Sequence, residues 1–500
     1  MNNTIYDVIV VGAGNAALCA ALSAKEQGAD VLMLERAPQE LRGGNSAFSG
    51  AGMRFVYQGV DDIKSIVRDL TEEELATSDF GAYTAEEYLD DLGSTSQYRT
   101  DPDLAEILVR RSADTVQWLR EKVGVRFIAK YGDAALKHEG RWRFFGGSVI
   151  RVNGAGRGLV EAEFKAVEKQ GISIRYGTRA TELLHGRSGV EGVRVIADRV
   201  QEEIRARAVV LACGGFEANR EWRTRYLGRG WDLAKVRGTR YNTGDGIRMA
   251  LKIGAQPCGN WSGAHATEWD LNAPEYGELA IGDAFSKHSY PLSIMLNVNG
   301  MRFLDEGEDT YNYTYAKYGR AILEQPGQAA WQIFDSKVIP RLRSSYRIRK
   351  VTKVTASTLE ELVARLEGVN SQQALKTIRE YNAAVMQDVP FNPNVKDGRG
   401  TRGLAVPKSN WAQTIDAPPF EAYGVTCGIT FTFGGLKIST EAQVLDMEEK
   451  PIPGLYAAGE LVGGVFYFNY PSGSGLMNGA VFGRAAGQNA AHYAQAAKRI

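Results

Sequence analysis

The chain lacks long apolar runs and any excess of charge. No uninterrupted apolar stretch approaches the ~20 residues that a membrane-spanning helix needs. The first apolar run contains Asp7 and leads straight into a glycine turn, so we expect no signal peptide. Lys and Arg together number 59, as do Asp and Glu, and this balance favours neither nucleic acid nor an anionic membrane. We therefore expect no membrane span and no nucleic-acid partner.

Cysteine is also scarce. The four cysteines form no Cys-x-x-Cys pair, and Cys19 and Cys213 lie in apolar segments, where they are interpreted as small core residues. This usage predicts a reducing, cytoplasmic location without disulfides, a zinc site or any other bound metal, or covalent haem. The remaining composition, 44% hydrophobic and 24% charged over 500 residues, is that of an ordinary globular chain with two or three domains, or one large sheet domain with an insertion.

What the chain does contain starts with a pattern in residues 5–35. Residues 6–11 form a short apolar run, typical of a strand buried on both faces of a parallel sheet. A glycine turn follows at residues 12–17, then apolar residues at helical spacing and a second apolar run at residues 31–34. Strand, turn, helix and strand in this order predict a Rossmann-like α/β fold.

The glycine turn predicts a dinucleotide site. Gly12 allows the tight turn, Gly14 has no side chain to keep a pyrophosphate off the backbone, and Ala17 lets the helix lie close to the sheet. The free amides at the helix N-terminus would then hold the phosphates. Glu35 lies 35 − 12 = 23 residues after the first glycine, close to the ~20 expected for an acid that binds a ribose hydroxyl.

A second loop, residues 42–52, is rich in glycine and serine and follows Glu35 closely. After a dinucleotide turn, we expect its backbone amides to wrap a second face of the same ligand. The glycines at 154–158 are interpreted instead as the entry to a helix around residues 159–167, because no buried strand precedes them. Residues 193–196 and 204–208 predict a hairpin.

The strand–helix alternation stops in the middle of the chain. From about Trp261 to Tyr423 the sequence is rich in Tyr, Trp, Asn and Pro, with helices expected near 357–367 and 371–386. The alternation returns at Leu455 and ends in a long small-residue helix over 474–497. The sequence therefore predicts a nucleotide-binding domain in two parts, at 1–260 and 426–500. A separate capping domain at 261–425 lies between them in the chain.

Several motifs occur together and in order, and they resemble the fumarate reductase/succinate dehydrogenase flavoprotein superfamily. They are residues 12–17, Gly43-Gly44-Asn45-Ser46, residues 212–216, Thr243-Gly244-Asp245-Gly246, residues 453–460 and residues 482–487. The resemblance covers nearly the whole chain. Within the superfamily, the sequence most resembles the tricarballylate dehydrogenase branch. It implies a Rossmann-like FAD-binding domain with an inserted α+β capping domain that closes over the site.

The resemblance implies FAD as the cofactor. Members that bind FAD covalently use a histidine where Asn45 stands, so FAD here is expected to be non-covalent. Glu460 is implied near the ribityl chain, and the amides of Gly475 and Leu476 at the pyrimidine edge of the flavin. The expected cofactor residues are Gly12, Ala13, Gly14, Asn15, Ala16, Glu35, Arg36, Arg42, Gly43, Gly44, Asn45, Ser46, Ala51, Gly52, Ala180, Ala212, Gly214, Asp245, Gly459, Glu460, Ser474, Gly475 and Leu476.

The implied activity is transfer of a hydride between FAD N5 and the carbon β to a carbonyl of an organic acid or ketone. His265 matches the histidine that contacts the substrate carboxylate in fumarate reductases. Other positions depart from that pattern: Phe431 replaces the second histidine and Tyr470 replaces the carboxylate-binding arginine. A phenol cannot form the bidentate ion pair of a guanidinium with a carboxylate, so the site is poorly equipped for a small dicarboxylate.

The tyrosines resemble the pocket of 3-ketosteroid dehydrogenases, where tyrosines act as acid or base and polarise a ketone. Tyr311, Tyr470 and Ser472 are therefore candidates for proton transfer and carbonyl polarisation, and Arg320 for anchoring a carboxylate. Tyr313 and Tyr318 are interpreted as interface residues. The predicted catalytic residues are Tyr311, Tyr470, Ser472, His265, Arg320 and Tyr315.

Two alternative functions stay open at this point. One is a flavoprotein oxidase that passes electrons to O2, and the other is a non-catalytic electron-transfer subunit. A tyrosine-rich pocket argues against the second, because electron transfer alone needs no acid or base. The expected partners are a small-molecule substrate and an electron acceptor, which could be a quinone, O2 or another protein.

Overall fold

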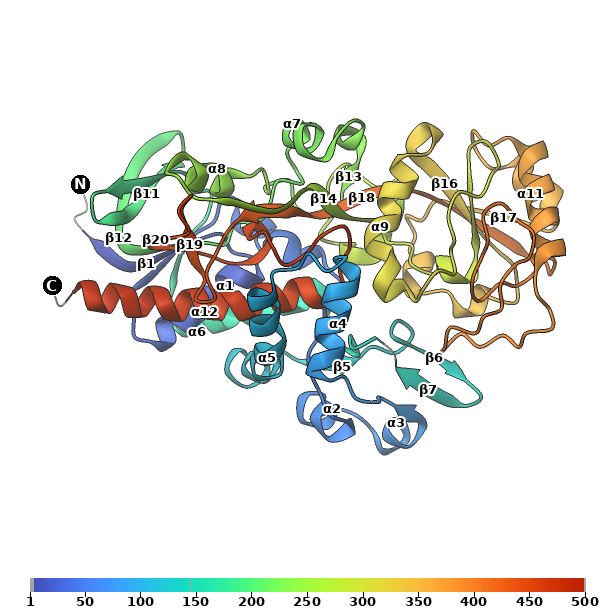
Figure 1. Cartoon of the computed structure of the whole chain (residues 1–500), viewed down its shortest axis with the longest axis horizontal. Helices are drawn as coiled ribbons and strands as arrows, with labels where there is room; N and C mark the ends of the chain where they lie inside the picture. Colours follow the sequence, from blue (N-terminus) through green and yellow to red (C-terminus); the bar gives the residue numbers. More distant parts are fainter. Residues whose placement is uncertain (1–3, 145, 499–500) are drawn as a thin grey trace.

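The computed structural model describes residues 4–144 and 146–498. The molecule is elongated, with a main sheet at one end and a second sheet at the other (Figure 1). The helices are α1 Asn15–Glu26, α2 Val60–Ile66, α3 Glu72–Thr77, α4 Ala85–Thr95, α5 Pro102–Trp118, α6 Ala155–Lys169, α7 Arg220–Trp222, α8 Asp245–Lys252, α9 Tyr311–Leu323, α10 Leu359–Ala364, α11 Ser371–Ala384 and α12 Ser474–Ala497. The strands are β1 Ile5–Val11, β2 Val31–Leu34, β3 Gly52–Met53, β4 Ser78–Asp79, β5 Phe127–Ala129, β6 Ala135–His138, β7 Arg141–Phe144, β8 Ile150–Val152, β9 Ser173–Arg175, β10 Arg179–Gly186, β11 Gly189–Ala197, β12 Val200–Leu211, β13 Lys235–Val236, β14 Pro257–Asp270, β15 Ile294–Asn297, β16 Ala329–Phe334, β17 Lys353–Ala356, β18 Phe420–Leu436, β19 Gln443–Leu445 and β20 Pro451–Ala457.

The main sheet has eight strands, and β1 lies near its centre. Its order is β10-β11-β12-β1-β2-β9, with β20 beside β12 and β19 beside β20. The strands β9, β2, β1, β12 and β20 are parallel, whereas β10, β11 and β12 form an antiparallel meander. Residues 8–11 are buried, as expected for a strand covered on both faces. The sheet confirms the predicted Rossmann-like α/β fold.

The last helix lies against the first. Figure 1 shows α12 running beside α1 under the main sheet. A Cβ added at Gly483 would lie 2.4 Å from the carbonyl oxygen of Ala16, and one at Gly487 would lie 2.0 Å from that of Ala20. Only glycine permits this approach, so the small residues of α12 set the distance between the two helices. The sequence predicted both ends of α12 correctly.

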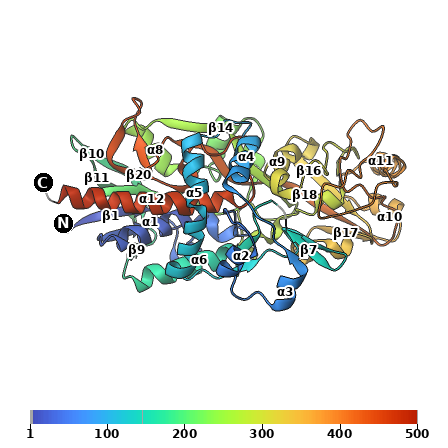
Figure 2. The same cartoon turned by 60° about the horizontal axis from the view of Figure 1, so that its bottom comes forward.

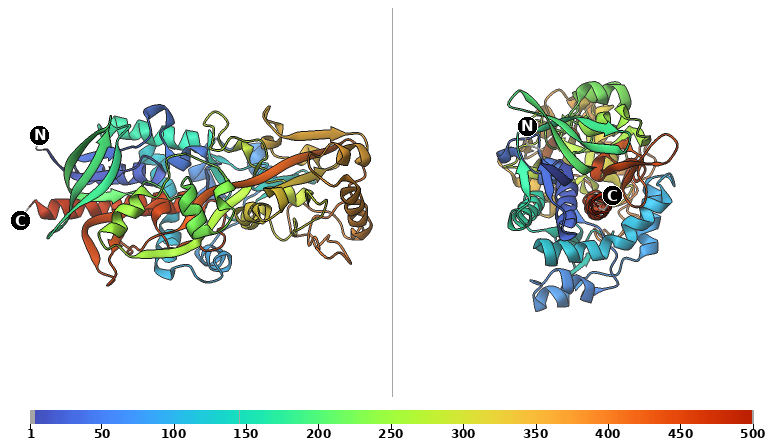
Figure 3. Two further views of the ribbon diagram at one scale, coloured as in Figure 1. Left: turned by 90° about the horizontal axis from the view of Figure 1, so that it is seen from above. Right: turned by 90° about the vertical axis from the view of Figure 1, so that its left-hand side faces the viewer.

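The second sheet has six strands. Its order is β13-β18-β16-β15, with β14 and β17 also paired to β18. The longest pair, β14 and β18, is antiparallel and extends from Pro257 opposite Leu436 to Asp270 opposite Val425. Viewed from above, β18 reaches from the middle of the molecule to its far end (Figure 3). The predicted domain boundaries fall inside these two strands, and the division into domains stays a prediction.

A helical layer, α2 to α5, covers one side of the molecule (Figure 2). Two small three-stranded sheets, β3-β8-β5 and β4-β7-β6, lie beside this layer. Within residues 4–144 and 146–498, no helix combines the length and apolarity that a bilayer crossing requires. The four cysteines are free thiols, and the described residues include no group of three or more His, Cys, Asp or Glu placed to hold a metal ion.

Candidate active site

A cavity of about 450 Å³ lies where the parallel strands end and the second sheet begins. Both predicted sets of residues contribute to its lining. From the cofactor set, the lining residues are Gly12, Ala13, Gly14, Asn15, Ala16, Glu35, Arg36, Gly44, Asn45, Ser46, Ala51, Gly52, Ala180, Ala212, Gly214, Asp245, Gly459, Glu460, Gly475 and Leu476. From the catalytic set they are Tyr311, Tyr315, Tyr470 and Ser472. The volume suits a small-molecule site.

The glycine turn fits a pyrophosphate. Gly12 has φ +115°, and a Cβ there would lie 2.3 Å from the carbonyl oxygen of Ala212, so the turn itself requires glycine. At Gly14 the nearest atom to an added Cβ is Ser46 Oγ at 3.5 Å, which leaves the space for a ligand. Helix α1 has no capping side chain and no acid in its first turn. The Asn15 amide donates to Ser46 Oγ at 3.1 Å, and the next amides of the first turn are available to an anion.

The predicted ribose acid is buried at the end of β2. One carboxylate oxygen of Glu35 accepts a hydrogen bond from the Ala37 amide at 2.6 Å. Burial raises the pKa of Glu35 to about 7, and nearby backbone amides oppose that shift. Asp245 accepts hydrogen bonds from Arg179 and Arg36; although burial raises the pKa of Asp245, these partners hold it below its ordinary value.

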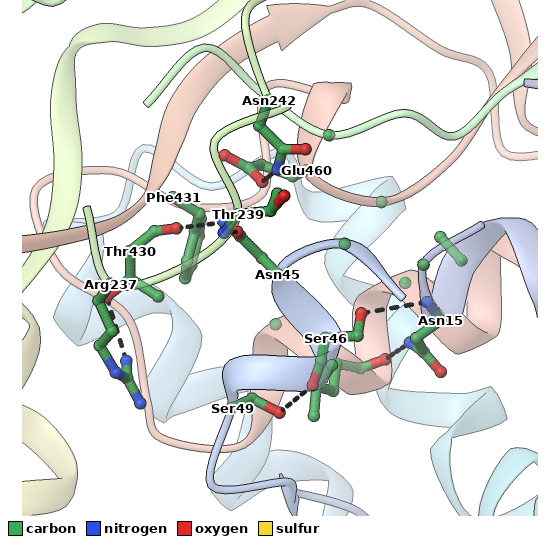
Figure 4. Close-up of a pocket in the computed structure, with 18 of the residues that line it drawn as sticks. Asn15, Asn45, Ser46, Ser49, Arg237, Thr239, Asn242, Thr430, Phe431 and Glu460 are labelled. Carbon is green, nitrogen blue, oxygen red and sulfur yellow. Dashed lines mark hydrogen bonds between the residues drawn. The ribbon is translucent and has the colours of Figure 1, made fainter. Parts of the chain in front are cut away.

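The side-chain amide of Asn45 makes hydrogen bonds to the protein through both its nitrogen and its oxygen. Its Nδ2 donates to Glu217 Oε1 at 2.6 Å and to the Thr430 carbonyl oxygen at 2.7 Å, and its Oδ1 accepts from the Thr239 amide at 2.9 Å. Figure 4 shows Asn45 between Thr239 and Thr430, with Glu460 nearby. An amide held in this way has no nucleophilic nitrogen, which fits a cofactor that is not covalently attached.

Glu217 and Glu460 form a second buried group beside Asn45. Asn242 Nδ2 donates to Glu217 Oε1 at 2.7 Å and to Glu460 Oε2 at 3.4 Å, and Glu460 Oε1 accepts from the Thr432 amide at 2.9 Å. Burial first, and then the neighbouring Glu460 carboxylate, raise the pKa of Glu217 well above its ordinary value. The sequence motifs included Glu460 but not Glu217.

Two tyrosines meet at the other end of the cavity. Tyr315 comes from α9 and Tyr470 from the loop before α12, and their hydroxyls are hydrogen-bonded to each other. The Tyr470 ring packs edge-on against Phe431, with ring centroids 5.2 Å apart. Burial raises the pKa of both phenols, and for Tyr470 the hydrogen bond to Tyr315 and the charge of Arg237 oppose that shift. Both phenols are thus kept as proton donors.

His265, which was predicted to contact the substrate, is not among the residues that line the cavity. It is fully buried, stacked on Phe431 and edge-on to Tyr315 and Tyr470. Burial, followed by the charge of Arg237, lowers its pKa well below the ordinary value. His265 therefore acts as a neutral packing partner behind the tyrosines.

Other predicted residues also lie outside the cavity lining. Arg320 points away from the site and pairs with Glu324 on the surface of α9, because it is five residues beyond Tyr315 and so on another face of the helix. Arg42 stacks on Phe164 at 3.9 Å. The remaining two are Gly43, which packs beside Val160, and Ser474, whose hydroxyl accepts a hydrogen bond from Tyr88.

Several charged residues line the cavity that the motifs did not indicate. Arg237 donates from Nε to Asp283 Oδ1 at 2.8 Å, and Arg343 lies over the Tyr311 ring at 3.6 Å. Lys130 Nζ lies 5.4 Å from the same ring. They come from loops of different parts of the chain, which share no local pattern. His288 also lines the cavity. It is the one residue of this group that the sequence could have indicated, because the chain has just five histidines and each is a candidate site residue.

A parallel sheet with a glycine turn at the end of its first strand, joined to a second sheet over a tyrosine-lined cavity, defines a flavoprotein oxidoreductase. A family model described as the FAD binding domain matches residues 7–476. The chain belongs to this FAD-binding family, within the fumarate reductase/succinate dehydrogenase flavoprotein superfamily.

Similar proteins agree with this assignment. A probable fumarate reductase of Shewanella frigidimarina is 32% identical, over 97% of this chain and 75% of the relative. The open form of a flavocytochrome c3 fumarate reductase superposes with a TM-score of 0.74 at 29% identity, covering 98% of this chain and 79% of that one. A 3-ketosteroid Δ1-dehydrogenase from Sterolibacterium denitrificans shares the fold, with a TM-score of 0.72 at 22% identity over 98% and 99% of the two chains.

These findings confirm the predicted superfamily, the FAD cofactor and the enzyme class. The protein is a FAD-dependent oxidoreductase that acts on CH–CH groups, by reduction of a C=C bond or by the reverse desaturation. The fit of the glycine turn, Glu35 and the N-terminus of α1 to a dinucleotide agrees with that assignment.

Proposed function

We propose that this protein transfers hydride to or from the carbon β to a carbonyl of an organic acid, with the hydrogen-bonded pair Tyr315 and Tyr470 at the reacting end of the cavity. This pair is the observation that carries the proposal. Two protonated phenols joined in a buried site form a donor group for an oxygen that gains negative charge during the reaction.

Bound FAD would supply the hydride or accept it. In our proposal Gly14 and the N-terminus of α1 hold its pyrophosphate, Glu35 binds the adenosine ribose, and Gly475 and Leu476 approach the flavin. Asn45 gives no covalent link. The sequence-based cofactor set, less the residues that lie outside the lining, is retained for this role.

The charge of the cavity supports an acid rather than a neutral ketone. Four cations line its substrate end, Lys130, Arg151, Arg237 and Arg343, against the carboxylates of Asp133 and Asp283. Among the described residues, no carboxylate lies within ion-pair distance of the Lys130 ammonium group. Because an uncompensated buried cation is costly, an anionic substrate group would stabilise this arrangement.

The finer substrate assignment rests on sequence alone. The resemblance to tricarballylate dehydrogenases favours a polycarboxylate, and the tyrosines favour a bulkier carbonyl compound. The capping domain at 261–425 is proposed to close the site against water. The electron partner, whether a quinone, O2 or another protein, and the cytoplasmic location are likewise proposals.

The proposal is tested with the purified FAD-loaded enzyme under anaerobic conditions. The flavin is reduced with dithionite and mixed with fumarate, trans-cinnamate, crotonate or 2-cyclohexen-1-one, and its reoxidation is followed by absorbance. Tricarballylate is added separately to the oxidised enzyme to test desaturation. We expect an acid of this panel to react, and the neutral enone to react more slowly than the acids.

Three outcomes would contradict the proposal, the first two in whole and the third in part. If none of the compounds changes the flavin spectrum while O2 reoxidises the reduced enzyme rapidly, the protein is an oxidase. If neither the compounds nor O2 react, it is an electron-transfer subunit. Faster reaction of 2-cyclohexen-1-one than of every acid would reject the acid substrate while keeping the reaction class.

A further inference from the structure

A chain of three buried side chains leads into the cavity beside the tyrosines. Thr267 and Glu268 are neighbours on β14, and His288 lies in the loop before β15. The Thr267 hydroxyl oxygen lies 3.0 Å from Glu268 Oε2, to which it donates when that carboxyl is ionised, and 2.6 Å from His288 Nε2. Thr267 and Glu268 are fully buried, whereas His288 is 5% exposed and lines the cavity.

One protonation pattern accounts for both short contacts between the three groups. If Glu268 carries a proton, it donates to the Thr267 hydroxyl oxygen, and Thr267 then donates to His288 Nε2. The proton of His288 is then on Nδ1, the ring nitrogen that has no hydrogen-bond partner among the described residues. Every donor in this pattern points from Glu268 towards the cavity.

Burial keeps the resting proton on Glu268, and burial with the nearby arginines keeps His288 neutral. Burial raises the pKa of Glu268 to about 8, and Arg343 and Arg237 oppose that shift. Burial, followed by the same two arginines, lowers the pKa of His288 well below its ordinary value. The ionisable groups facing the pair are Arg343, Arg237, Lys130 and His265 around His288, and Tyr290, Tyr346 and Cys427 around Glu268.

We propose that Glu268, Thr267 and His288 form a buried proton relay that opens into the cavity at Nδ1 of His288. It supplies the proton that the substrate gains at the carbon α to its carbonyl, and it removes that proton in the reverse direction. The inference rests on the proposed function and adds the source of its proton.

The protons balance over one turnover in the direction of C=C reduction. Nδ1 of His288 gives its proton to the substrate carbon, and Nε2 takes the Thr267 proton. Thr267 takes the Glu268 proton, so Glu268 is left as a carboxylate beside Arg343 and Arg237. Those two cations stabilise the carboxylate until a solvent proton restores the acid. No electron moves through the relay.

The relay position also separates its role from that of the tyrosine pair. The His288 ring is edge-on to Tyr315, with centroids 5.0 Å apart, and stacks on Tyr311 at 6.0 Å. Tyr315 and Tyr470 are bonded to each other, so they are placed to polarise the carbonyl. His288 and Tyr311 face the cavity from the next positions along its wall.

The test uses Glu268→Gln and Thr267→Val in the FAD-loaded enzyme. Glu268→Gln keeps the shape of the side chain without a transferable acid proton. Thr267→Val keeps the shape too and replaces the hydroxyl by a methyl group. We expect each to slow reoxidation of dithionite-reduced enzyme by about 10²-fold or more, with the panel compound that reacts fastest with wild type. Thr267→Ser should restore most of the rate.

The pH profile and an infrared spectrum give readouts that a structural role would not change. Wild-type rates should fall as pH rises through about 8, where Glu268 loses its proton, and this limb should vanish in Glu268→Gln. The infrared absorption of protonated carboxyl groups should also lose one component in that variant at pH 7, while the components from the other buried carboxyls remain. Glu163→Gln, at another fully buried glutamate, is the matched control for the rate and should react as wild type.

The results distinguish the relay from the proposed function. If no panel compound reacts with wild type, the proposed function is rejected, and the relay with it. If wild type reacts with a panel compound, and both Glu268→Gln and Thr267→Val react as fast as wild type, only the relay is rejected. An ionised Glu268 at pH 7 would also reject the relay, whichever compound reacts.

Discussion

At the scale of single residues, the hydrogen bond between Tyr315 and Tyr470 joins positions 155 residues apart in the chain. Replacing the proton donor of this pair by phenylalanine should lower the reoxidation rate of the reduced enzyme by about 10²–10⁴-fold while FAD stays bound. We expect the larger loss for Tyr470→Phe, because its position replaces a substrate-binding arginine of fumarate reductases. Stopped-flow absorbance measures both variants.

Tyr318→Phe is the control for this prediction. The Tyr318 hydroxyl donates to the Asp305 carbonyl oxygen and is absent from the cavity lining. Its loss should change the rate little. Wild-type rates in both Tyr315→Phe and Tyr470→Phe would mean that other groups polarise the carbonyl, and Arg237, whose charge acts on both phenols, is then the first candidate.

The glycine turn gives a cofactor prediction. Because an added Cβ at Gly14 meets no protein atom closer than 3.5 Å, Gly14→Ala should fold normally yet bind FAD weakly. Gly12→Ala should disturb folding itself, since its Cβ would strike Ala212. Equilibrium dialysis and circular dichroism separate the two effects.

Acid precipitation of wild type should release FAD into the supernatant, and yellow colour left in the pellet would show a covalent link.

Buried carboxyls also predict how stability depends on pH. Glu268 and Glu35 have pKa values of about 8 and about 7 in the folded protein, above the ~4.3 of an unfolded glutamate. Between these values the folded state binds more protons, so the free energy of unfolding falls as pH rises from about 5 to 8. Each group contributes a slope of about 1.4 kcal/mol per pH unit.

Chemical denaturation of the FAD-free protein from pH 5 to pH 8 measures this slope. Glu268→Gln should remove one group's share of it, whereas Glu324→Gln, at an exposed position, should not. An unchanged slope in Glu268→Gln would mean that this carboxyl is ionised in the folded protein.

The residues that the sequence predicted are those with a local pattern. Gly12, Gly14 and Glu35 follow one another in a single strand–turn–helix–strand unit, so their spacing alone places them at one site. Arg237 and Arg343 come from separate loops and reach the cavity only through tertiary packing. His265 and Arg320 were placed by resemblance, and here the aromatic layer and the helix face put both outside the cavity.

At the scale of elements, the contact between α1 and α12 is set by glycine. An added Cβ at Gly487 would lie 2.0 Å from the Ala20 carbonyl oxygen, so Gly487→Ala must push the helices apart. We expect a loss of about 1–3 kcal/mol of unfolding free energy, measured by urea denaturation, and weaker FAD binding because α1 carries the glycine turn.

Gly59→Ala serves as the control for Gly487→Ala, because its Cβ would meet no atom within 4 Å. Equal stability of the two variants would show that α12 can move without cost. The sequence predicted α12 well because small residues recur throughout residues 474–497 and no proline interrupts them. It did not predict β14 and β18, since their long pairing joins segments more than 150 residues apart and leaves no βα pattern.

At the scale of the whole molecule, the proposed capping domain connects to the rest through β14 and β18. The pairing of these strands shifts register between Asn260 and Ala264, at the predicted boundary between residues 260 and 261. We expect the cap to rotate about Asn260 and Tyr423-Gly424 when substrate binds. Spin labels at Val200→Cys on β12 and Lys376→Cys on α11 should therefore change their distance on addition of the reacting acid.

A label pair within the cap, Lys376→Cys and Arg402→Cys, should keep its distance and so controls for local effects. An unchanged distance between β12 and α11 in the presence of bound acid would show that the two sheets form one rigid unit, with access to the cavity by another route.

The position of α12 has a consequence for the order in which the protein matures. The turn after β1 leaves the ribosome well before Gly475 and Leu476, which complete the cavity. Strand β20, which borders β12 in the main sheet, is likewise made after the strands between which the turn lies. The nucleotide site of the nascent chain therefore stays incomplete until α12 has been made. We expect a chain truncated before residue 474 to bind FAD more weakly than the full chain.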